Sequence, residues 1–244
     1  MRNSVVGIYS VAGGVGKTSL CANLGRMLCS LGEQILLVDV TGGGHLPFYF
    51  GASDGRDGLR TFTASNGSCS PIKIFESKDP SGKWFDEQAK SLLQASQRSV
   101  LDLGAASAGL LSQLLGLCDL LLVPLSPGLN SLLTVSRIDS LVGELQVKEM
   151  HAPFPFYVLN AFDLNNPKEI QARDAIARLC GDRLVTGFIR RSDQVSEASA
   201  KRMNVMDYAP ESEVARDYFD LAMWVRSIAP AIPAVHAVER WSEQ

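Results

Sequence analysis

The residues with the clearest chemical meaning follow an apolar segment near the start of the chain. Residues 4–11 have the composition of a buried strand, and Gly13-Gly14-Val15-Gly16-Lys17-Thr18-Ser19 comes next, before a helical pattern. Glycines let successive backbone N–H groups turn toward an anion, and a helix start adds free N–H groups and a positive dipole end. Lys17 would reach the β- and γ-phosphates of a nucleotide, and the Thr18 hydroxyl would bind Mg²⁺. The pattern predicts a phosphate-binding loop.

This loop departs from the general pattern Gly-x-x-x-x-Gly-Lys-[Ser/Thr] at one position, because Val11 stands where the first glycine belongs. The alternative interpretation is a glycine-rich turn whose lysine is only solvated. The strand–loop–helix order favours the phosphate loop over that turn.

Two carboxylates close apolar strands that should end beside this loop. Asp102 ends the run at 99–103, where it would hold Mg²⁺ through water; it could equally cap the helix that follows. Asp39 ends the run at 34–40 and would orient the Lys-Thr end of the loop or a metal-bound water. The alternative for Asp39 is an Asx-type turn that leads into the following glycines.

The elements that must position these residues alternate along the chain. Expected strands cover 4–11, 34–40, 71–75, 99–103, 119–125, 154–160 and 184–189, and expected helices cover 17–31, 84–97, 110–117, 129–147, 167–180 and 213–228. Residues 51–70 are expected to be loop, with a short helical turn at 59–62. The alternation predicts an α/β fold of three layers: a doubly wound, mostly parallel sheet with helices on both faces. We expect one domain over 1–228 and a C-terminal tail over 229–244.

The composition is that of a globular protein without strong charge. The 244 residues are 46% apolar and 20% charged, and the net charge of −3 gives no overall attraction to nucleic acid or anionic lipid. Five cysteines without C-x-x-C spacing predict reduced thiols. No signal peptide opens the sequence, and no apolar run reaches the roughly 20 residues that a membrane span needs. We therefore expect a cytoplasmic protein without a transmembrane segment.

Several of these stretches together resemble the ParA/MinD family of deviant Walker A ATPases. The phosphate loop, Leu36-Leu37-Val38-Asp39, Leu101-Asp102 and the run at 118–124 carry the likeness, and the segments 189–192, 196–198 and 205–210 are similar to the closing motif of that family. The likeness spans most of residues 4–226. Within the family the chain is most similar to the BcsQ branch, which is encoded with bacterial cellulose synthase, through residues 113–119, 158–163 and 189–210.

The resemblance implies an ATP–Mg²⁺ site and a homodimer that sandwiches the nucleotide, with a protein partner that reads dimer formation. It places Asn160 against the adenine base, although a plain strand-end turn is the alternative for this residue, and it places the loop that begins at Ile189 and Arg190 over the other side of the base. The branch implies a partner in a membrane-bound cellulose synthase or secretion complex, with recruitment to the inner membrane through that partner.

Two positions depart from the family pattern. Ala12 stands where the family usually has a second lysine that reaches the partner's nucleotide, and Thr41 stands where it usually has the aspartate that positions the attacking water. Phosphoryl transfer depends on positioning and charge stabilisation, so both losses argue for slow or absent hydrolysis even though Lys17, Asp39 and Asp102 are present. Arg190 or Arg191 could compensate; a solvated loop face is the alternative.

Two other function classes stay open at this stage. A DNA-binding partition or positioning ATPase would need a basic surface, for which Arg190, Arg191, Lys201 and Arg202 are the candidates. A small-molecule kinase or ligase would need an acceptor site, and the sequence displays no distinct one. A membrane-binding tail would be basic and amphipathic, whereas residues 234–244 carry two acids and one base.

Overall fold

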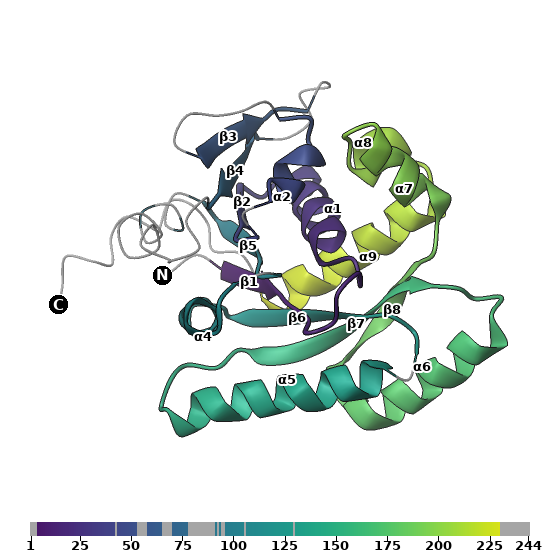
Figure 1. Ribbon diagram of the computed structural model, residues 1–244. Coiled ribbons are helices and arrows are strands. Elements are labelled where there is room, and N and C mark those ends of the chain that lie inside the picture. Colours follow the sequence, from purple (N-terminus) through teal and green to yellow (C-terminus); the bar gives the residue numbers. More distant parts are fainter. Residues whose placement is uncertain are drawn as a thin grey trace.

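The chain folds around one eight-stranded sheet with helices on both faces (Figure 1). The computed structural model describes residues 4–41, 43–52, 58–64, 70–77, 91, 93, 96–104, 106–128 and 130–229. The strand order is β3-β4-β2-β5-β1-β6-β7-β8. All described pairs are parallel except β3 with β4. The predicted three-layer α/β fold is confirmed.

The elements follow one another along the chain with these bounds: β1 Ser4–Ile8, α1 Lys17–Ser30, β2 Ile35–Asp39, α2 His45–Phe48, β3 Leu59–Phe62, β4 Ile72–Glu76, β5 Arg98–Asp102, α4 Ala108–Leu115, β6 Leu120–Leu125, α5 Asn130–Val147, β7 Phe154–Phe162, α6 Pro167–Cys180, the 3₁₀ turn η3 Gly181–Arg183, β8 Leu184–Arg190, α7 Asp193–Ala200, α8 Val205–Tyr208 and α9 Glu213–Ile228.

Two hydrophobic cores cover the two faces of the sheet. α1 and α9 pack on one face, and α4, α5 and α6 pack on the other (Figure 1). The central strands are buried on both faces, which explains their continuous apolar sequences. Cys21, Cys29, Cys118 and Cys180 are buried free thiols, and Cys69 lies outside the described residues. No helix in the described part of the chain is long and apolar enough to cross a membrane.

The predicted helical turn at 59–62 is wrong. Leu59–Phe62 is strand β3, which pairs antiparallel with β4 at the edge of the sheet. Four residues carry no helical period, and a tertiary contact decides the conformation: the Arg60 guanidinium lies 2.7 Å from Glu76 Oε2, and both side chains are buried. The short helices α2, α7 and α8 were not predicted. The predicted helix at 84–97 lies almost wholly outside the described residues, as does the tail after residue 229.

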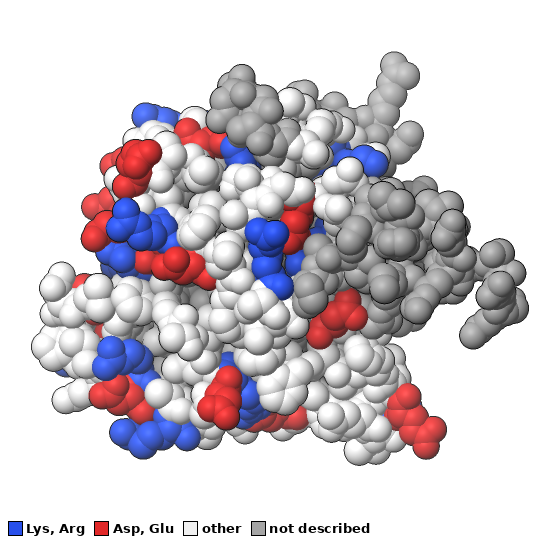
Figure 2. Space-filling model, turned by 180° about the vertical axis from the view of Figure 1, so that it is seen from behind, with Lys and Arg blue, Asp and Glu red and all other residues white. Residues whose placement is uncertain are grey.

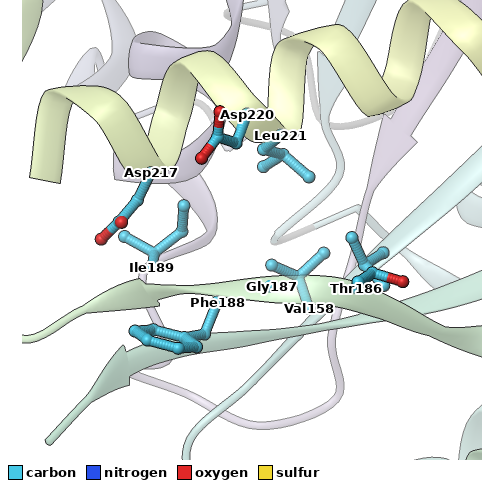
Figure 3. Close-up of a pocket in the computed structure, with 9 residues that line it drawn as sticks. Val158, Thr186, Gly187, Phe188, Ile189, Asp217, Asp220 and Leu221 are labelled. Atoms are coloured by element: carbon cyan, nitrogen blue, oxygen red, sulfur yellow. The ribbon is translucent and has the colours of Figure 1, made fainter. Parts of the chain in front are cut away.

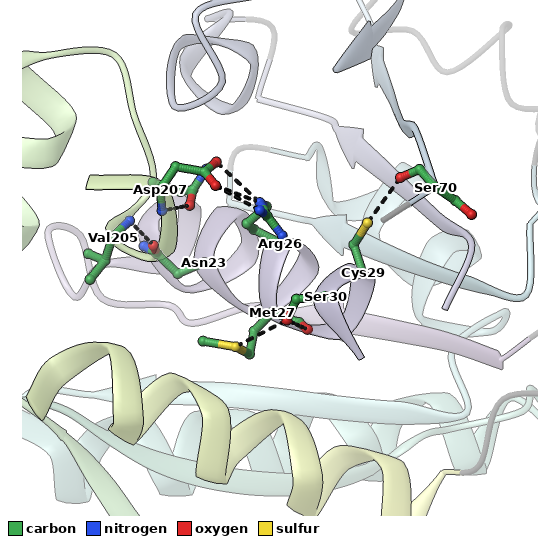
Figure 4. Close-up of polar contacts among 9 residues, drawn as sticks. Asn23, Arg26, Met27, Cys29, Ser30, Ser70, Val205 and Asp207 are labelled. Carbon is green, nitrogen blue, oxygen red and sulfur yellow. Dashed lines mark hydrogen bonds and ion pairs between the residues drawn. The ribbon is translucent and has the colours of Figure 1, made fainter. Parts of the chain in front are cut away.

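Polar contacts fasten α8 to the middle of α1 (Figure 4). The Arg26 side chain is 2% exposed, and its Nε and Nη2 donate to the Asp207 carboxylate at 2.7 to 3.1 Å. Asn23 Oδ1 accepts from the backbone N–H of Val205 at 2.7 Å. The segment after β8 is therefore attached to the helix that begins at the phosphate loop.

Removing the Asp207 carboxylate should destabilise the protein. Asp207→Ala leaves the buried Arg26 cation without this partner, so we expect the free energy of unfolding to fall by about 3 kcal/mol. Asp174→Ala is the control, because its ion pair with Arg173 is exposed on both sides and should contribute less than about 1 kcal/mol. Urea denaturation of both variants measures the two values; equal losses would contradict the structural role of Asp207.

Candidate functional site

The loop between β1 and α1 has the backbone shape of an anion cradle. Gly14 and Gly16 have φ of +69° and +83°, a region that side chains with a Cβ rarely adopt. Gly16 is also the N-cap of α1, and no side chain caps this helix start. The N–H groups of the first turn thus have no side-chain acceptor, which fits a phosphate.

Lys17 and Ser19 extend from this first turn in different directions. Lys17 Nζ folds back over the loop and donates to the Ala12 carbonyl at 2.7 Å. Burial lowers the pKa of the Lys17 ammonium, and the charge of Asp102 opposes that shift. The Ser19 side chain instead hydrogen-bonds to Tyr218 of α9, so a phosphate contact by Ser19 would use its N–H group.

Thr18 and Asp102, the two residues predicted to bind Mg²⁺, lie together, and the metal site itself stays a prediction. The Thr18 hydroxyl donates to Asp102 Oδ2 at 2.5 Å, and the Gly104 N–H donates to Oδ1 at 3.2 Å. The Asp102 side chain is fully buried. Burial raises the pKa of Asp102 from 3.8 to about 6, with a further rise from Asp39, although the hydrogen bonds and Lys17 offset part of the shift. A hydroxyl and a buried carboxylate at this spacing are suited to a magnesium ion held partly by phosphate and water.

Asp39 lies beside Asp102, since the two residues are partners on β2 and β5. Its Oδ1 accepts from the N–H and the hydroxyl of Thr41 at 2.8 and 2.5 Å, and its Oδ2 accepts from the Leu46 N–H at 3.0 Å. The contact to the N–H two residues on is an Asx turn, one of the two interpretations left open by the sequence. A catalytic role for Asp39 stays a prediction.

Gly104 marks the point where these groups converge, and sequence reasoning missed it. A Cβ on Gly104 would stand 3.0 Å from Lys17 Cε, 3.2 Å from Asp102 Oδ1 and 3.6 Å from the Thr41 methyl carbon. Thr41 therefore brings a methyl group to the place where the family pattern has a carboxylate. The position of Gly104, two residues after the acid that ends β5, is the sequence feature that could have indicated it.

Ala12 borders an open space. A cavity of about 340 Å³ lies between the phosphate loop and the first turn of α5, and Ala12, Gly13, Ser131 and Thr134 are among its lining residues. The short side chain leaves this space without a cation from position 12.

Asn160, near the C-terminal end of β7, contacts the phosphate loop. Its Nδ2 donates to the Val15 carbonyl at 2.8 Å, and the side chain is buried. The predicted contact of Asn160 with a base stays a prediction, but the structure brings this residue to the loop that would hold the phosphates.

Ile189 and Arg190 end β8 in a different environment. Ile189 lines a cavity of about 240 Å³ between β8 and α9, together with Asp217 and Leu221 (Figure 3). Ile189 is 2% exposed, and its predicted contact with a nucleotide stays a prediction. Arg190 Nε and Nη2 donate to the two oxygens of Asp217 at 2.8 and 2.9 Å, and Nη1 also pairs with Glu213.

The two arginines considered as replacements for the missing lysine are thus both held by acids of this chain. Arg191 Nη2 donates to Glu169 at 2.7 Å and Nη1 lies 3.7 Å from Asp163. Neither guanidinium is directed at the phosphate loop by these contacts.

The family model described as the CobQ/CobB/MinD/ParA nucleotide binding domain matches residues 6–205. The chain belongs to this family. The resemblance to ParA and MinD is confirmed at this level, and the phosphate loop lies within the matched range.

Several solved structures have the same fold. McdA from Cyanothece, an aspartate-to-alanine variant in complex with ATP, is 17% identical with a TM-score of 0.72, over 95% of this chain and 99% of that chain. The cell division ATPase MinD from Pyrococcus furiosus is 19% identical with a TM-score of 0.72, over 93% and 100%. A ParA family ATPase from Chlorobium tepidum is 20% identical with a TM-score of 0.67, over 91% and 98%. At these identities the likeness shows the fold alone.

In the nucleotide-free protein, Asp102→Asn should increase stability at pH 8. The pKa of Asp102 is higher in the folded state than in the unfolded state. The stability that this carboxyl contributes is therefore fully present below about pH 4 and is lost as the pH rises through about 6. A difference of about two pKa units corresponds to about 3 kcal/mol. The free energy of unfolding of Asp102→Asn should therefore exceed that of the unmodified protein by this amount at pH 8 and equal it near pH 4. Urea denaturation at both pH values measures the difference. Asp182→Asn changes an exposed carboxylate and is the control; equal stability of Asp102→Asn and the unmodified protein at pH 8 would contradict the burial penalty.

Proposed function

We propose that the chain binds ATP with Mg²⁺ at this loop and forms a homodimer that sandwiches the nucleotide. The dimer serves as a nucleotide-gated assembly or localisation factor, with slow or absent hydrolysis. One observation carries the proposal: Lys17, Thr18 and Asp102 lie together at the phosphate loop, whereas positions 12 and 41 bring no charge to it.

The donor set supports a nucleotide with Mg²⁺. The uncapped start of α1 offers N–H groups to phosphates, Lys17 offers a cation, and Thr18 would bind the metal directly with Asp102 behind a water. A bound Mg²⁺ would supply charge neutralisation for the β- and γ-phosphates. It would also remove the penalty that now raises the pKa of Asp102.

The missing charges support slow hydrolysis. Removing one group that stabilises developing charge commonly lowers a rate by ~10²–10³. Here two such positions carry Ala12 and Thr41, and Arg190 and Arg191, the candidate replacements, are paired with acids. The bound nucleotide would then act as a long-lived switch that holds two copies together.

The likeness to the BcsQ branch supports a role in bacterial cellulose synthesis and secretion. It rests on residues 113–119, 158–163 and 189–210. We propose a cytoplasmic dimer that a partner in a membrane-bound synthase or secretion complex recruits to the inner membrane.

A DNA-binding positioning ATPase is the alternative, and the surface gives it less support. The four basic residues considered for such a surface include Arg190 and Arg191, whose charges are neutralised by Asp217, Glu213, Glu169 and Asp163. On the face seen in Figure 2, basic and acidic side chains of the described residues lie next to one another. Retention on nonspecific DNA at low salt that requires ATP would favour this alternative.

Oligomeric state tests the proposed switch. Size-exclusion chromatography with light scattering should find a dimer in ATP–Mg²⁺ and a monomer in ADP, with little phosphate release from the same samples. Lys17→Ala should weaken ATP binding at least about tenfold and abolish the dimer, because a hydrogen bond to a charged group is lost. Lys168→Ala, an exposed residue of α6, is the control. A monomer in both nucleotides with brisk phosphate release would overturn the proposal.

Restoring the two missing charges should restore turnover. We expect the double variant A12K/T41D to release phosphate from ATP at least about tenfold faster than the unmodified protein, because each group stabilises charge or positions water. The cavity beside Ala12 has room for the lysine. The triple variant that adds Lys17→Ala should lose the gained activity. An unchanged rate in A12K/T41D would mean that these two positions do not limit hydrolysis.

A further inference from the structure

Three aromatic rings form a strip on the surface where the last helix ends. Phe154, the first residue of β7, is 57% exposed, and its ring meets Phe156 edge-to-face at a centroid distance of 5.1 Å. Phe156 in turn meets Trp224 of α9 edge-to-face at 4.9 Å. We call these three rings the aromatic strip. We propose that residues 230–235, which follow the described part of the chain, pack on the aromatic strip as an extended segment.

The described residues leave this strip partly uncovered. β8 begins opposite Tyr157, so Phe154 lies beyond the start of β8. Phe156 and Trp224 are only partly buried, and Ile228, one turn after Trp224 on the same side of α9, is 49% exposed. Contiguous aromatic and aliphatic surface of this kind usually marks a contact with another segment or another molecule.

The chain leaves α9 beside this strip. Ala229 packs against the same hydrophobic core as Phe156 and Trp224, and five residues of helical rise place it roughly 7 Å beyond Trp224 along the axis. Its φ of −128° and ψ of 77° show that the helix has ended, because Pro230 disfavours a helical conformation at the residue before it. Residues 230–235 therefore begin next to the strip, and the short connection gives them a high effective concentration there.

The sequence of residues 230–235 suits an aromatic surface. Pro-Ala-Ile-Pro-Ala-Val contains no polar or charged side chain, and its prolines are three positions apart. A polyproline II helix has three residues per turn, so these prolines would lie on one side, and grooves that bind such segments are lined by aromatic rings. At about 3.1 Å per residue, six residues would span ~19 Å, which is long enough to cross all three rings.

Trp224 also offers a polar contact. Its indole N–H donates no hydrogen bond to any residue that the structure describes, although a tryptophan N–H usually finds a partner as it becomes buried. A polyproline II segment has no internal hydrogen bonds, so its backbone carbonyls are free to accept. A carbonyl of residues 230–235 that accepts from Trp224 Nε1 would fix the segment on the strip.

A double-mutant cycle in the full chain tests the contact. Phe154→Ala removes an exposed ring, and the variant P230G/P233G removes both prolines. Groups in contact have non-additive effects, so we expect the combined variant to lower the folding equilibrium constant at least about threefold less than the product of the two separate factors. Urea denaturation at micromolar protein concentration measures these constants. Effects of the prolines on the unfolded chain cancel in the cycle.

Two matched variants are the controls. Leu179→Ala removes an apolar side chain that is 48% exposed on α6, on the opposite face of the sheet, and its effect should add to that of P230G/P233G. The variant A237G/V238G places two glycines after the proposed segment, and its effect should add to that of Phe154→Ala.

A spectroscopic measurement reports on the strip itself. In protein labelled with 5-fluorotryptophan, the ¹⁹F resonance of Trp224 is assigned by its loss in Trp224→Phe. P230G/P233G should move this resonance and increase its shift between H₂O and D₂O, because the indole becomes more accessible to solvent. A237G/V238G should leave both unchanged.

The results that would overturn the proposal are distinct. Additive effects of Phe154→Ala and P230G/P233G, or a Trp224 resonance that P230G/P233G leaves unchanged, would each overturn it. Coupling that appears only as the protein concentration rises would overturn it as well, and would place residues 230–235 on the strip of a second copy. Additive effects together with binding to phosphatidylglycerol vesicles that Phe154→Ala abolishes would instead assign the strip to a lipid surface.

Discussion

The side-by-side burial of Asp39 and Asp102 is the electrostatic constraint that organises this end of the sheet. The two residues are neighbours on β2 and β5, and neither side chain is exposed. Buried carboxylates without hydrogen-bond donors would be strongly unfavourable. The donors come from three segments: Thr41 and Leu46 after β2, Gly104 after β5, and Thr18 at the start of α1. The hydrogen bonds to these two carboxylates therefore position both the phosphate loop and the segment after β2.

The two acids are similar in sequence and different in environment. Asp39 accepts three hydrogen bonds from the segment that follows β2. Asp102 has two donors, and burial together with the charge of Asp39 still raises its pKa to about 6. A carboxylate in that condition gains most from a nearby cation, because opposite charge favours its ionised form. This environment is consistent with the predicted Mg²⁺ role of Asp102, which stays a prediction.

Sequence reasoning succeeded where the signal was long and local. The apolar strands predict the parallel sheet, because a strand buried on both faces needs apolar residues throughout. The glycines before Lys17 predict the phosphate loop, because positive φ favours glycine. It failed at β3, where four residues take their conformation from a partner strand and the Arg60–Glu76 pair. The hydrogen bond from Asn160 to Val15 could not be predicted from the sequence, because it depends on a register shift between β7 and β8 and on the order of strands in the sheet. The acids that pair with Arg190 and Arg191 lie on or beside helices that are separate in sequence. Those ion pairs could therefore not be predicted from the sequence either.

The same geometry that supports binding limits turnover under the proposed function. Phosphate contacts from Lys17 and the α1 N-terminus act on ATP in its ground state, and uniform binding of this kind does not accelerate the chemical step. Acceleration needs groups that act on the transition state, and positions 12 and 41 supply a methyl group each where the family pattern has charge. An ATP-bound dimer built this way would end its life by nucleotide release, or when a partner contributes the missing groups. The lifetime of the assembled state would then be set by contacts outside the phosphate loop.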